Sequence, residues 1–125
     1  MLKSTTEQET FDLVVNHLLT QNERAVIEGK CRYRLGSLKC AVGCLIPDTL
    51  YTEDMEERSV GPLLDKFPHL RNVVAINHHD HLLNGLQGVH DDFEPVNWPL
   101  RLRNVALCFG LNTFAIDNHP RVKTP

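Results

Sequence analysis

The sequence lacks what several large classes of protein need. None of its apolar runs approaches the ~20 residues of a membrane-spanning helix. Its 13 lysines and arginines face 16 aspartates and glutamates, and the net charge of −3 excludes a histone-like basic binder and is too mild for a bulk mimic of DNA. One tryptophan, two tyrosines and five phenylalanines are too few to predict a stacking platform for single strands. We therefore expect neither a membrane nor a nucleic acid as partner.

Motifs that carry chemistry are missing as well. The sequence contains no G-x-G-x-x-G, no P-loop, no H-E-x-x-H and no EF-hand loop, which removes the usual signatures of nucleotide-binding proteins and metalloenzymes. Its first residues do not show the basic-then-apolar pattern of a signal peptide, so we expect a cytoplasmic protein. The four cysteines are then thiols or metal ligands rather than disulfides.

What is present is typical of one globular domain. The 125 residues are 42% hydrophobic and 23% charged, which is ordinary for a domain of this length. We predict a single globular domain over residues 1–116. Residues 117–125 contain two prolines and no apolar stripe, so we expect a loose C-terminal tail there.

Apolar periodicity predicts mainly helices. The first follows a cap at Thr5 or Thr6, and its apolar side chains recur at helical spacing on one face: Phe11, Val14, Val15, Leu18 and Leu19. Residues 21–26 are expected to form a turn followed by a short second helix that stops at Gly29. Longer helices are predicted over residues 80–90 and 98–109, with Gly110 in the position that ends the last of them.

Residues 31–43 have a different pattern. Apolar and basic residues alternate over 31–35, Gly36 and Ser37 can form a turn, and residues 38–42 run back. This predicts a β-hairpin. The expected fold class is therefore α+β and mainly helical: a compact bundle of short helices with one small β-hairpin near residues 31–43.

The cysteines allow a metal site. Three of them have the spacing C-x8-C-x3-C: Cys31, Cys40 and Cys44. Zinc needs four donors in a tetrahedron, and the fourth could come from one of the histidines His78, His79, His81 or His90. The spacing is not that of a standard finger or ribbon, and free cysteine often only fills a core. We expect no cofactor, with zinc held by Cys31, Cys40, Cys44 and His90 as the alternative.

The same residue types allow a small cysteine-dependent enzyme. A catalytic version would pair the Cys40 thiolate with the imidazole of His90 and the carboxylate of Asp48 or Asp91. No glycine-flanked nucleophile elbow accompanies them. His90 also lies on an apolar stripe, where a buried histidine bonded to a carboxylate or carbonyl is the ordinary arrangement. The sequence favours a protein that is not an enzyme.

Basic side chains gather on and beside the predicted hairpin. They are Lys30, Arg32, Arg34 and Lys39, with Tyr33 between two of them. Strand alternation places Arg32 and Arg34 on one face, although a solvated strand face has the same pattern. The carboxylates of residues 53–57 give an opposite patch, and such a bipolar surface favours a protein partner. The predicted partner contacts are Arg32, Tyr33, Arg34 and Lys39.

Some segments carry information beyond periodicity. They are F-D-L-V-V-N-H-L-L-T-Q at 11–21, C-R-Y-R at 31–34, K-C-A-V-G-C-L-I-P-D-T-L-Y at 39–51, L-Q-G-V-H-D at 86–91 and Trp98. Together they resemble a group of small uncharacterised proteins encoded by bacterial phages and prophages. The resemblance covers roughly residues 8–110, and the C-A-V-G-x-L-I-P-D stretch is its most specific part. It implies a phage accessory protein that acts in the host cytoplasm, and it implies no activity.

The leading hypothesis combines these observations. The resemblance, the small size, the bipolar surface and the missing catalytic motifs predict a protein that binds a host protein and inhibits or modulates it. A bacterial defence system is a host target that fits the hypothesis. The zinc-stabilised module and the cysteine-dependent enzyme remain as alternatives.

Overall fold

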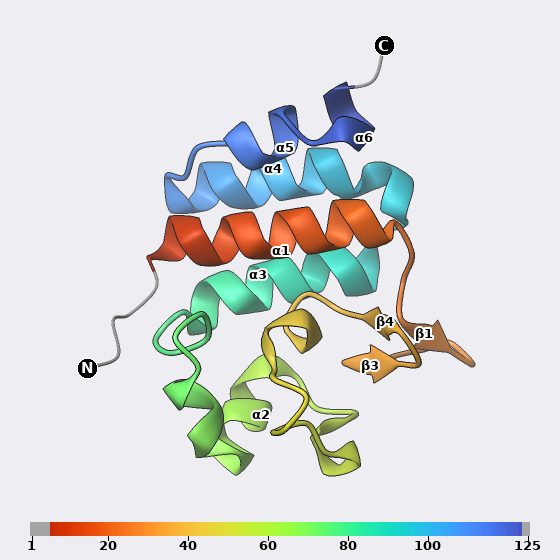
Figure 1. Cartoon of the computed structure of the whole chain (residues 1–125), viewed down its shortest axis with the longest axis vertical. Coiled ribbons are helices and arrows are strands. Elements are labelled where there is room, and N and C mark those ends of the chain that lie inside the picture. The colour runs from red at the N-terminus through yellow and green to blue at the C-terminus, as the bar shows by residue number, and fades with distance from the viewer. Residues whose placement is uncertain (1–5, 124–125) are drawn as a thin grey trace.

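The computed structural model describes residues 6–123 (Figure 1). The longer helices are α1 (Glu7–Gln21), α3 (Asp80–Asp92) and α4 (Trp98–Phe109), and each of them packs against the other two in a three-helix bundle. Shorter helices complete the fold: α2 (Val60–Lys66), α5 (Phe114–Asp117) and α6 (Pro120–Lys123). The fold is α+β and mainly helical, as the sequence predicts. Within residues 6–123, no helix combines the length and hydropathy that crossing a membrane requires.

Helix α1 begins where its sequence supplies a capping box. The Thr6 hydroxyl accepts a hydrogen bond from the Glu9 N–H at 3.1 Å, and the Glu9 carboxylate accepts one from the Thr6 N–H at 3.1 Å. Thr5, the other expected cap, lies outside the described residues. The helix ends at Gln21. Asn22 caps it, because its N–H makes the last helical bond to the Leu18 carbonyl and its left-handed φ of 52° turns the chain away.

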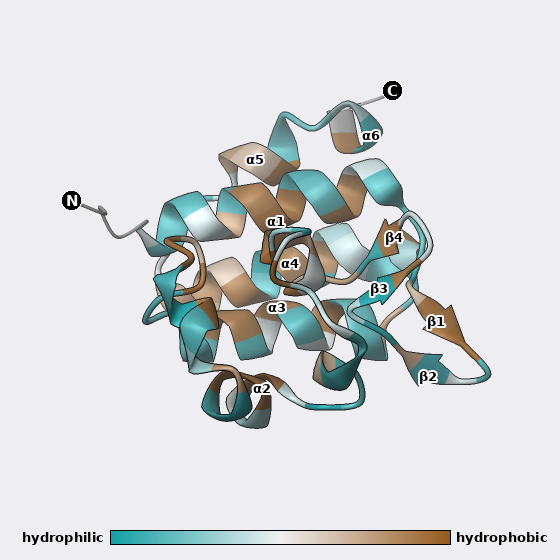
Figure 2. Ribbon diagram, turned by 60° about the horizontal axis from the view of Figure 1, so that its bottom comes forward, coloured by the Kyte–Doolittle hydropathy of each residue, from teal (hydrophilic) through white to brown (hydrophobic). Residues whose placement is uncertain are grey.

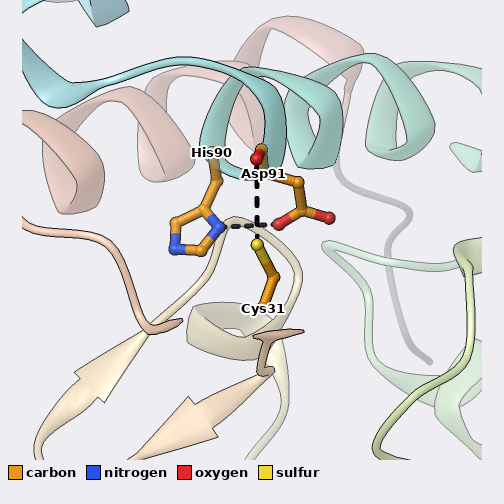
Figure 3. Close-up of side chains that lie close together, drawn as sticks. All are labelled: Cys31, His90 and Asp91. Atoms are coloured by element: carbon orange, nitrogen blue, oxygen red, sulfur yellow. Dashed lines mark hydrogen bonds and ion pairs between the residues drawn. The ribbon is translucent and has the colours of Figure 1, made fainter. Parts of the chain in front are cut away.

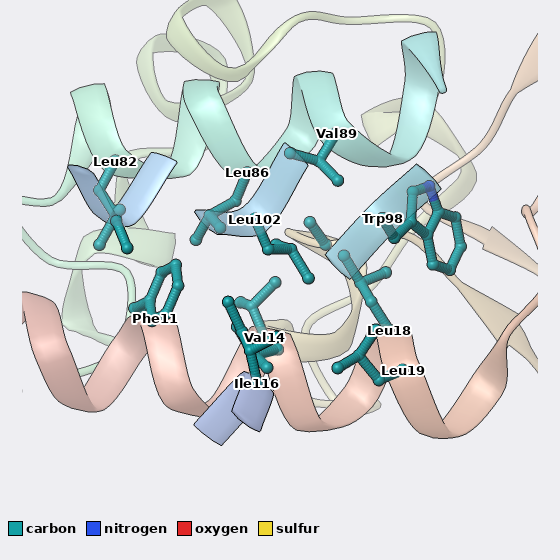
Figure 4. Packing of buried hydrophobic residues seen from close by; sticks show 13 residues of the cluster. Phe11, Val14, Leu18, Leu19, Leu82, Leu86, Val89, Trp98, Leu102 and Ile116 are labelled. Atoms are coloured by element: carbon teal, nitrogen blue, oxygen red, sulfur yellow. The ribbon is translucent and has the colours of Figure 1, made fainter. Parts of the chain in front are cut away.

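The predicted stripe of α1 forms the larger core. All five of its apolar side chains are buried, and Figure 4 shows them against α3, α4 and Ile116 of α5. Trp98 closes one end of this core, and its indole N–H donates to the Phe93 carbonyl at 2.9 Å. Each buried leucine of this core contributes about 1.5–3 kcal/mol. The core therefore gives α3 and α4 fixed positions.

A second core lies on the other side of α3. It joins α2 to the irregular segments between residues 40 and 76, and its largest members include Ile46, Met55, Leu63 and Leu70. Gly43 is required here because a Cβ at this position would lie 2.0 Å from the Tyr33 carbonyl oxygen. This close approach anchors the hairpin region to the core.

The sequence predicts one hairpin, and the structure has two. Strand β3 (Arg34–Leu35) pairs with β4 (Leu38–Lys39) around the expected turn, where Gly36 has a φ of +61°. Strand β1 (Val26–Ile27) pairs with β2 (Lys30–Cys31) in a second hairpin, so the prediction of a short helix before Gly29 is wrong. Its turn needs two left-handed residues, and Glu28 occupies one of them with a φ of 51°. Glutamate is not a turn signal, so periodicity gave no indication of this pair. Figure 2 shows both pairs at one edge of the molecule.

The expected loose tail contains structure as far as residue 123. Helices α5 and α6 lie over α1 and α4, and Ile116 is fully buried (Figure 1). His119 is buried and its Nε2 lies 3.0 Å from the Thr20 hydroxyl of α1. Arg121 donates to the Pro95 carbonyl. Helices of one turn are too short to show periodicity, which is why the sequence analysis did not predict them.

Candidate functional site

Cys31, His90 and Asp91 lie together where β2 meets the end of α3 (Figure 3). Among residues 6–123 they are the one group of three such side chains whose potential ligand atoms all lie within 4.8 Å of one another. The sequence alternatives named Cys31 and His90 for zinc, and His90 for catalysis. The structure brings Cys31, and not Cys40, to the His90–Asp91 pair.

Both ring nitrogens of His90 are already engaged. The Ala25 N–H donates to Nε2 at 2.9 Å, so Nε2 carries no proton. The Nδ1–H therefore donates to the Asp91 carboxylate at 2.7 Å. The ring is fully buried and stacks on Trp98 with 5.8 Å between centroids. This confirms the expectation of a buried, carboxylate-bonded histidine, and it leaves no lone pair for a metal ion or for a thiol proton.

Cys31 is also in an environment that disfavours chemistry. Its thiol is half-buried, and burial followed by the Asp91 carboxylate raises its pKa. The guanidinium of Arg24 lies 3.5 Å from the sulfur and also donates to the Asp91 carbonyl at 2.5 Å. The positive charge of Arg24 beside the sulfur repels a metal cation. The thiol opens on a cavity of about 280 Å³, but it is held in its protonated form.

The remaining residues of the zinc alternative do not join this group. Cys40 is fully buried, its pKa is raised by burial, and its sulfur accepts the Gly43 N–H at 3.2 Å. Burial raises the pKa of Cys44 to about 12, and its thiol donates to the Ala41 carbonyl at 3.0 Å. Cys40 is a core thiol, and Cys44 is partly buried beside the core. Of the predicted zinc ligands, Cys31 and His90 belong to this group, and Cys40 and Cys44 do not.

The catalytic alternative fails on Asp48 as well as on Cys40. Asp48 is exposed and accepts from Arg34 at 2.5 Å, and this contact lowers its pKa. The carboxylate that contacts His90 is that of Asp91. In the His78–His81 run, Asp80 is held by Arg71 through two hydrogen bonds of 2.7 and 2.8 Å.

The predicted basic ridge is covered by the acidic segment that was expected opposite it. Arg32 donates to Glu53 at 2.8 Å, Lys30 lies 3.2 Å from Glu57, and Lys39 lies 3.8 Å from Asp48. Arg34, besides its bond to the same Asp48, donates to the Ile46 carbonyl. The prediction of a bipolar surface is therefore wrong, because the two patches pair with each other. Sequence periodicity does not reveal this pairing, because the paired residues lie far apart in the sequence.

Tyr33 is part of the core instead of the surface. It is 5% exposed, and its hydroxyl donates to the Arg58 carbonyl at 2.5 Å. Its N–H donates to the Glu56 carboxylate at 2.8 Å, and the N–H of Arg34 donates to the same group at 3.2 Å. The Glu56 carboxylate also accepts from the Tyr51 hydroxyl at 2.5 Å. These donors satisfy the buried carboxylate, which links the hairpin region at Tyr33 and Arg34 to the segment 51–56.

Lys39 alone of the predicted contacts lines a larger open surface, a groove along α1. Three adjoining cavities of about 480, 510 and 420 Å³ share Leu13, which is 53% exposed. The groove is lined by Glu9, Asp12, Leu13, Asn16, His17, Thr20 and Gln21 of α1, by Ser37, Leu38 and Lys39 of the β3–β4 hairpin, and by Cys44, Leu45 and Ala75.

Hydrogen bonds fix the hairpin wall of this groove. The Gln21 amide donates to the Lys39 carbonyl at 2.8 Å and accepts the Lys39 N–H at 2.9 Å. The Nε2 of His17 donates to the same carbonyl at 2.9 Å, and burial lowers the pKa of His17. Leu13 lies outside the buried stripe of α1, and this lone apolar residue was the signal available in the sequence.

No protein-family model, curated protein or solved structure matches this chain. The grounds for a function are therefore the geometry of the described residues.

The Glu56 contacts predict a large difference between neighbouring carboxylates. Glu56→Gln removes the charge and places an amide NH2 among donors, so we expect a loss of about 2–4 kcal/mol in the free energy of unfolding. Glu57→Gln is the control, because Glu57 is 70% exposed and makes one surface ion pair. It should cost at most about 1 kcal/mol. Urea denaturation of both variants measures this, and equal losses would contradict the role of Glu56.

The environment of Cys31 predicts that its thiol is alkylated slowly. At pH 7, iodoacetamide should modify Cys31 several-fold more slowly than the exposed Cys108, because the raised pKa of Cys31 lowers its thiolate fraction. Mass spectrometry of peptides from native protein gives both rates in one sample. Rapid modification of Cys31 at pH 6 would instead support the cysteine-dependent enzyme.

Proposed function

We propose that this chain is a phage-encoded accessory protein that binds a protein of the bacterial host through the groove along α1 and inhibits or modulates it. It acts without catalysis, in the host cytoplasm. The observation that carries the proposal is the groove itself, in which three adjoining cavities meet at an exposed leucine. The phage resemblance makes a component of a bacterial defence system the host target that we favour.

The state of the polar side chains supports a binding role over a chemical one. The nitrogens of His90 are engaged, the thiols of Cys40 and Cys44 are buried or partly buried and have raised pKa values, and the cluster around Cys31 includes the guanidinium of Arg24. Their hydrogen bonds serve the fold. A protein with its reactive groups committed in this way acts through its surface.

The dimensions of the groove fit a segment of another protein. From Glu9 to Gln21 the wall of α1 is about 18 Å long, enough for three turns of a helix or a short extended strand. Leu13, Leu38 and Leu45 supply apolar contacts. Asn16 supplies an amide that has no hydrogen-bond partner within residues 6–123 and is free to bind one.

Charged residues of opposite sign line different parts of the groove. Carboxylates lie at the end formed by the first turns of α1, and Lys39 lies in the cavity beside the hairpin. Complementary charges set orientation and association rate more than affinity. We therefore propose a host segment with an apolar centre that carries basic residues at the end that lies beside Glu9 and Asp12.

Leu13→Asp should abolish most of the binding. Burial of a leucine contributes about 1.5–3 kcal/mol, so we expect at least about a tenfold loss of the host protein retained from lysate. The matched control is Leu107→Asp, since Leu107 is an 81% exposed leucine of α4 that does not line the groove. Quantitative mass spectrometry of pull-downs with the tagged protein measures both. Equal retention by wild type and Leu13→Asp, or equal loss by both variants, would contradict the groove as the site.

A further inference from the structure

His17 of α1 presents an unpaired hydrogen-bond acceptor in the groove. Its Nε2 lies 2.9 Å from the Lys39 carbonyl oxygen. A carbonyl oxygen only accepts hydrogen bonds, so Nε2 carries a proton and donates it. Burial lowers the pKa of His17 below its ordinary value, so the ring is neutral at pH 7. The second ring nitrogen, Nδ1, therefore keeps its lone pair.

The Nδ1 atom of His17 is open to the groove. Among residues 6–123 no donor reaches it, and it is not sealed inside the protein, as the unpaired Oδ1 of Asn77 is. The ring lines two of the three cavities, those of about 480 and 510 Å³. A partner that covers this atom has to supply a donor, because an acceptor that is buried without one costs about 1–3 kcal/mol.

The fold has little need of this imidazole. The Gln21 amide donates to the same Lys39 carbonyl at 2.8 Å and accepts the Lys39 N–H at 2.9 Å, so the hairpin stays bonded to α1 without His17. The side chain of His17 belongs to neither hydrophobic core. What its bond to Lys39 does is to fix the ring and to leave Nδ1 as the free nitrogen.

We propose that Nδ1 of His17 accepts a hydrogen bond from a backbone N–H of the host segment in the groove, and that this segment is extended. This role rests on the proposed function and deepens it, because it specifies the conformation of what the groove binds. His17 is then a residue that determines specificity.

Other polar groups of the groove favour an extended segment over a helix. The Asn16 amide and the Ser37 hydroxyl line the same cavity as His17, and neither has a hydrogen-bond partner within the described part of the chain. The interior of a helix has its N–H and C=O groups bonded internally, whereas an extended segment can offer both at each residue. Such a segment can pair with these groups while its side chains contact Leu13 and Leu38.

The tautomer of His17 can be measured on the protein alone. Long-range ¹H–¹⁵N correlation spectra at pH 7 should show a protonated Nε2 and an unprotonated Nδ1 for this ring. The loss of these signals in His17→Phe assigns them. A protonated Nδ1 would overturn the proposed hydrogen bond and would leave the groove itself as the binding site.

Peptides of random sequence test what the groove accepts. Peptides of ~10 residues, long enough to follow the wall of α1 in extended form, are selected on the full chain. Those that do not bind Leu13→Asp occupy the groove. In each of them, N-methylation removes one backbone N–H at a time. We expect one position at which it weakens binding about tenfold, because Nδ1 then lacks its donor.

A variant at position 17 connects that N–H to His17. His17→Phe keeps an aromatic ring but removes both nitrogens, so it should also weaken the unmodified peptide about tenfold. In this variant, methylation of the sensitive N–H should have no further effect, since its acceptor is gone. His81→Phe is the matched control, because His81 is exposed on α3 and does not line the groove. Circular dichroism confirms that both variants are folded.

The outcomes separate this hydrogen bond from the groove. Peptides that need Leu13 but tolerate N-methylation at every position, or whose sensitivity persists in His17→Phe, would overturn the extended segment and leave the groove as the binding site. If none of the selected peptides needed Leu13, the groove would be wrong as the binding site, and the proposed function would fail with it.

Discussion

The buried carboxylate of Glu56 is the contact on which the arrangement of the surface depends. It accepts hydrogen bonds from the N–H groups of Tyr33 and Arg34 and from the hydroxyl of Tyr51. Glu56 holds residues 48–57 against the hairpin region, where carboxylates of this stretch pair with Arg32 and Arg34. A buried charge is tolerated only with such partners, so the segment and the hairpin fold as one unit.

The same pairing uses up the charged side chains of the hairpin region. The guanidiniums of Arg32 and Arg34 are committed to the chain's own carboxylates, and Tyr33 is core. On the side of the hairpin that faces α1, Lys39 lines the groove. His90 shows the same kind of internal pairing. Its ring accepts the Ala25 N–H and donates to the Asp91 carboxylate, so both ring nitrogens are already hydrogen-bonded. In both places, internal pairing converts residues with functional chemistry into structural ones.

Local rules predicted the helices that carry a periodic stripe. The apolar row of α1, the cap at Thr6 and the glycine after α4 are all signals within a few residues of the feature they specify. The turn at Gly36 is local in the same sense. The β1–β2 hairpin has a turn that is made with Glu28, a residue whose left-handed conformation no propensity favours. Its existence depends on tertiary context.

The candidate sites depended on contacts across the chain, which sequence spacing does not contain. Cys31 meets His90 and Asp91 only because β2 lies at the end of α3, and the spacing of the cysteines pointed to a different set. Arg32 meets Glu53, 21 positions further along, because the intervening segment folds back. A charge pattern gives the sign of a surface but not whether that surface pairs with itself. The groove has the same origin, since its walls come from separate segments of the chain.

The most direct measurement is site-specific photo-crosslinking in infected cells. A photoreactive phenylalanine analogue is placed at Leu13, inside the groove, or at Arg32, on the closed hairpin surface, and crosslinked host proteins are identified by mass spectrometry. We expect one host protein to be enriched at position 13 and absent at position 32. Crosslinking at position 32 without position 13 would show that the hairpin opens to bind. Absence of a host protein at both positions would contradict a host-binding function.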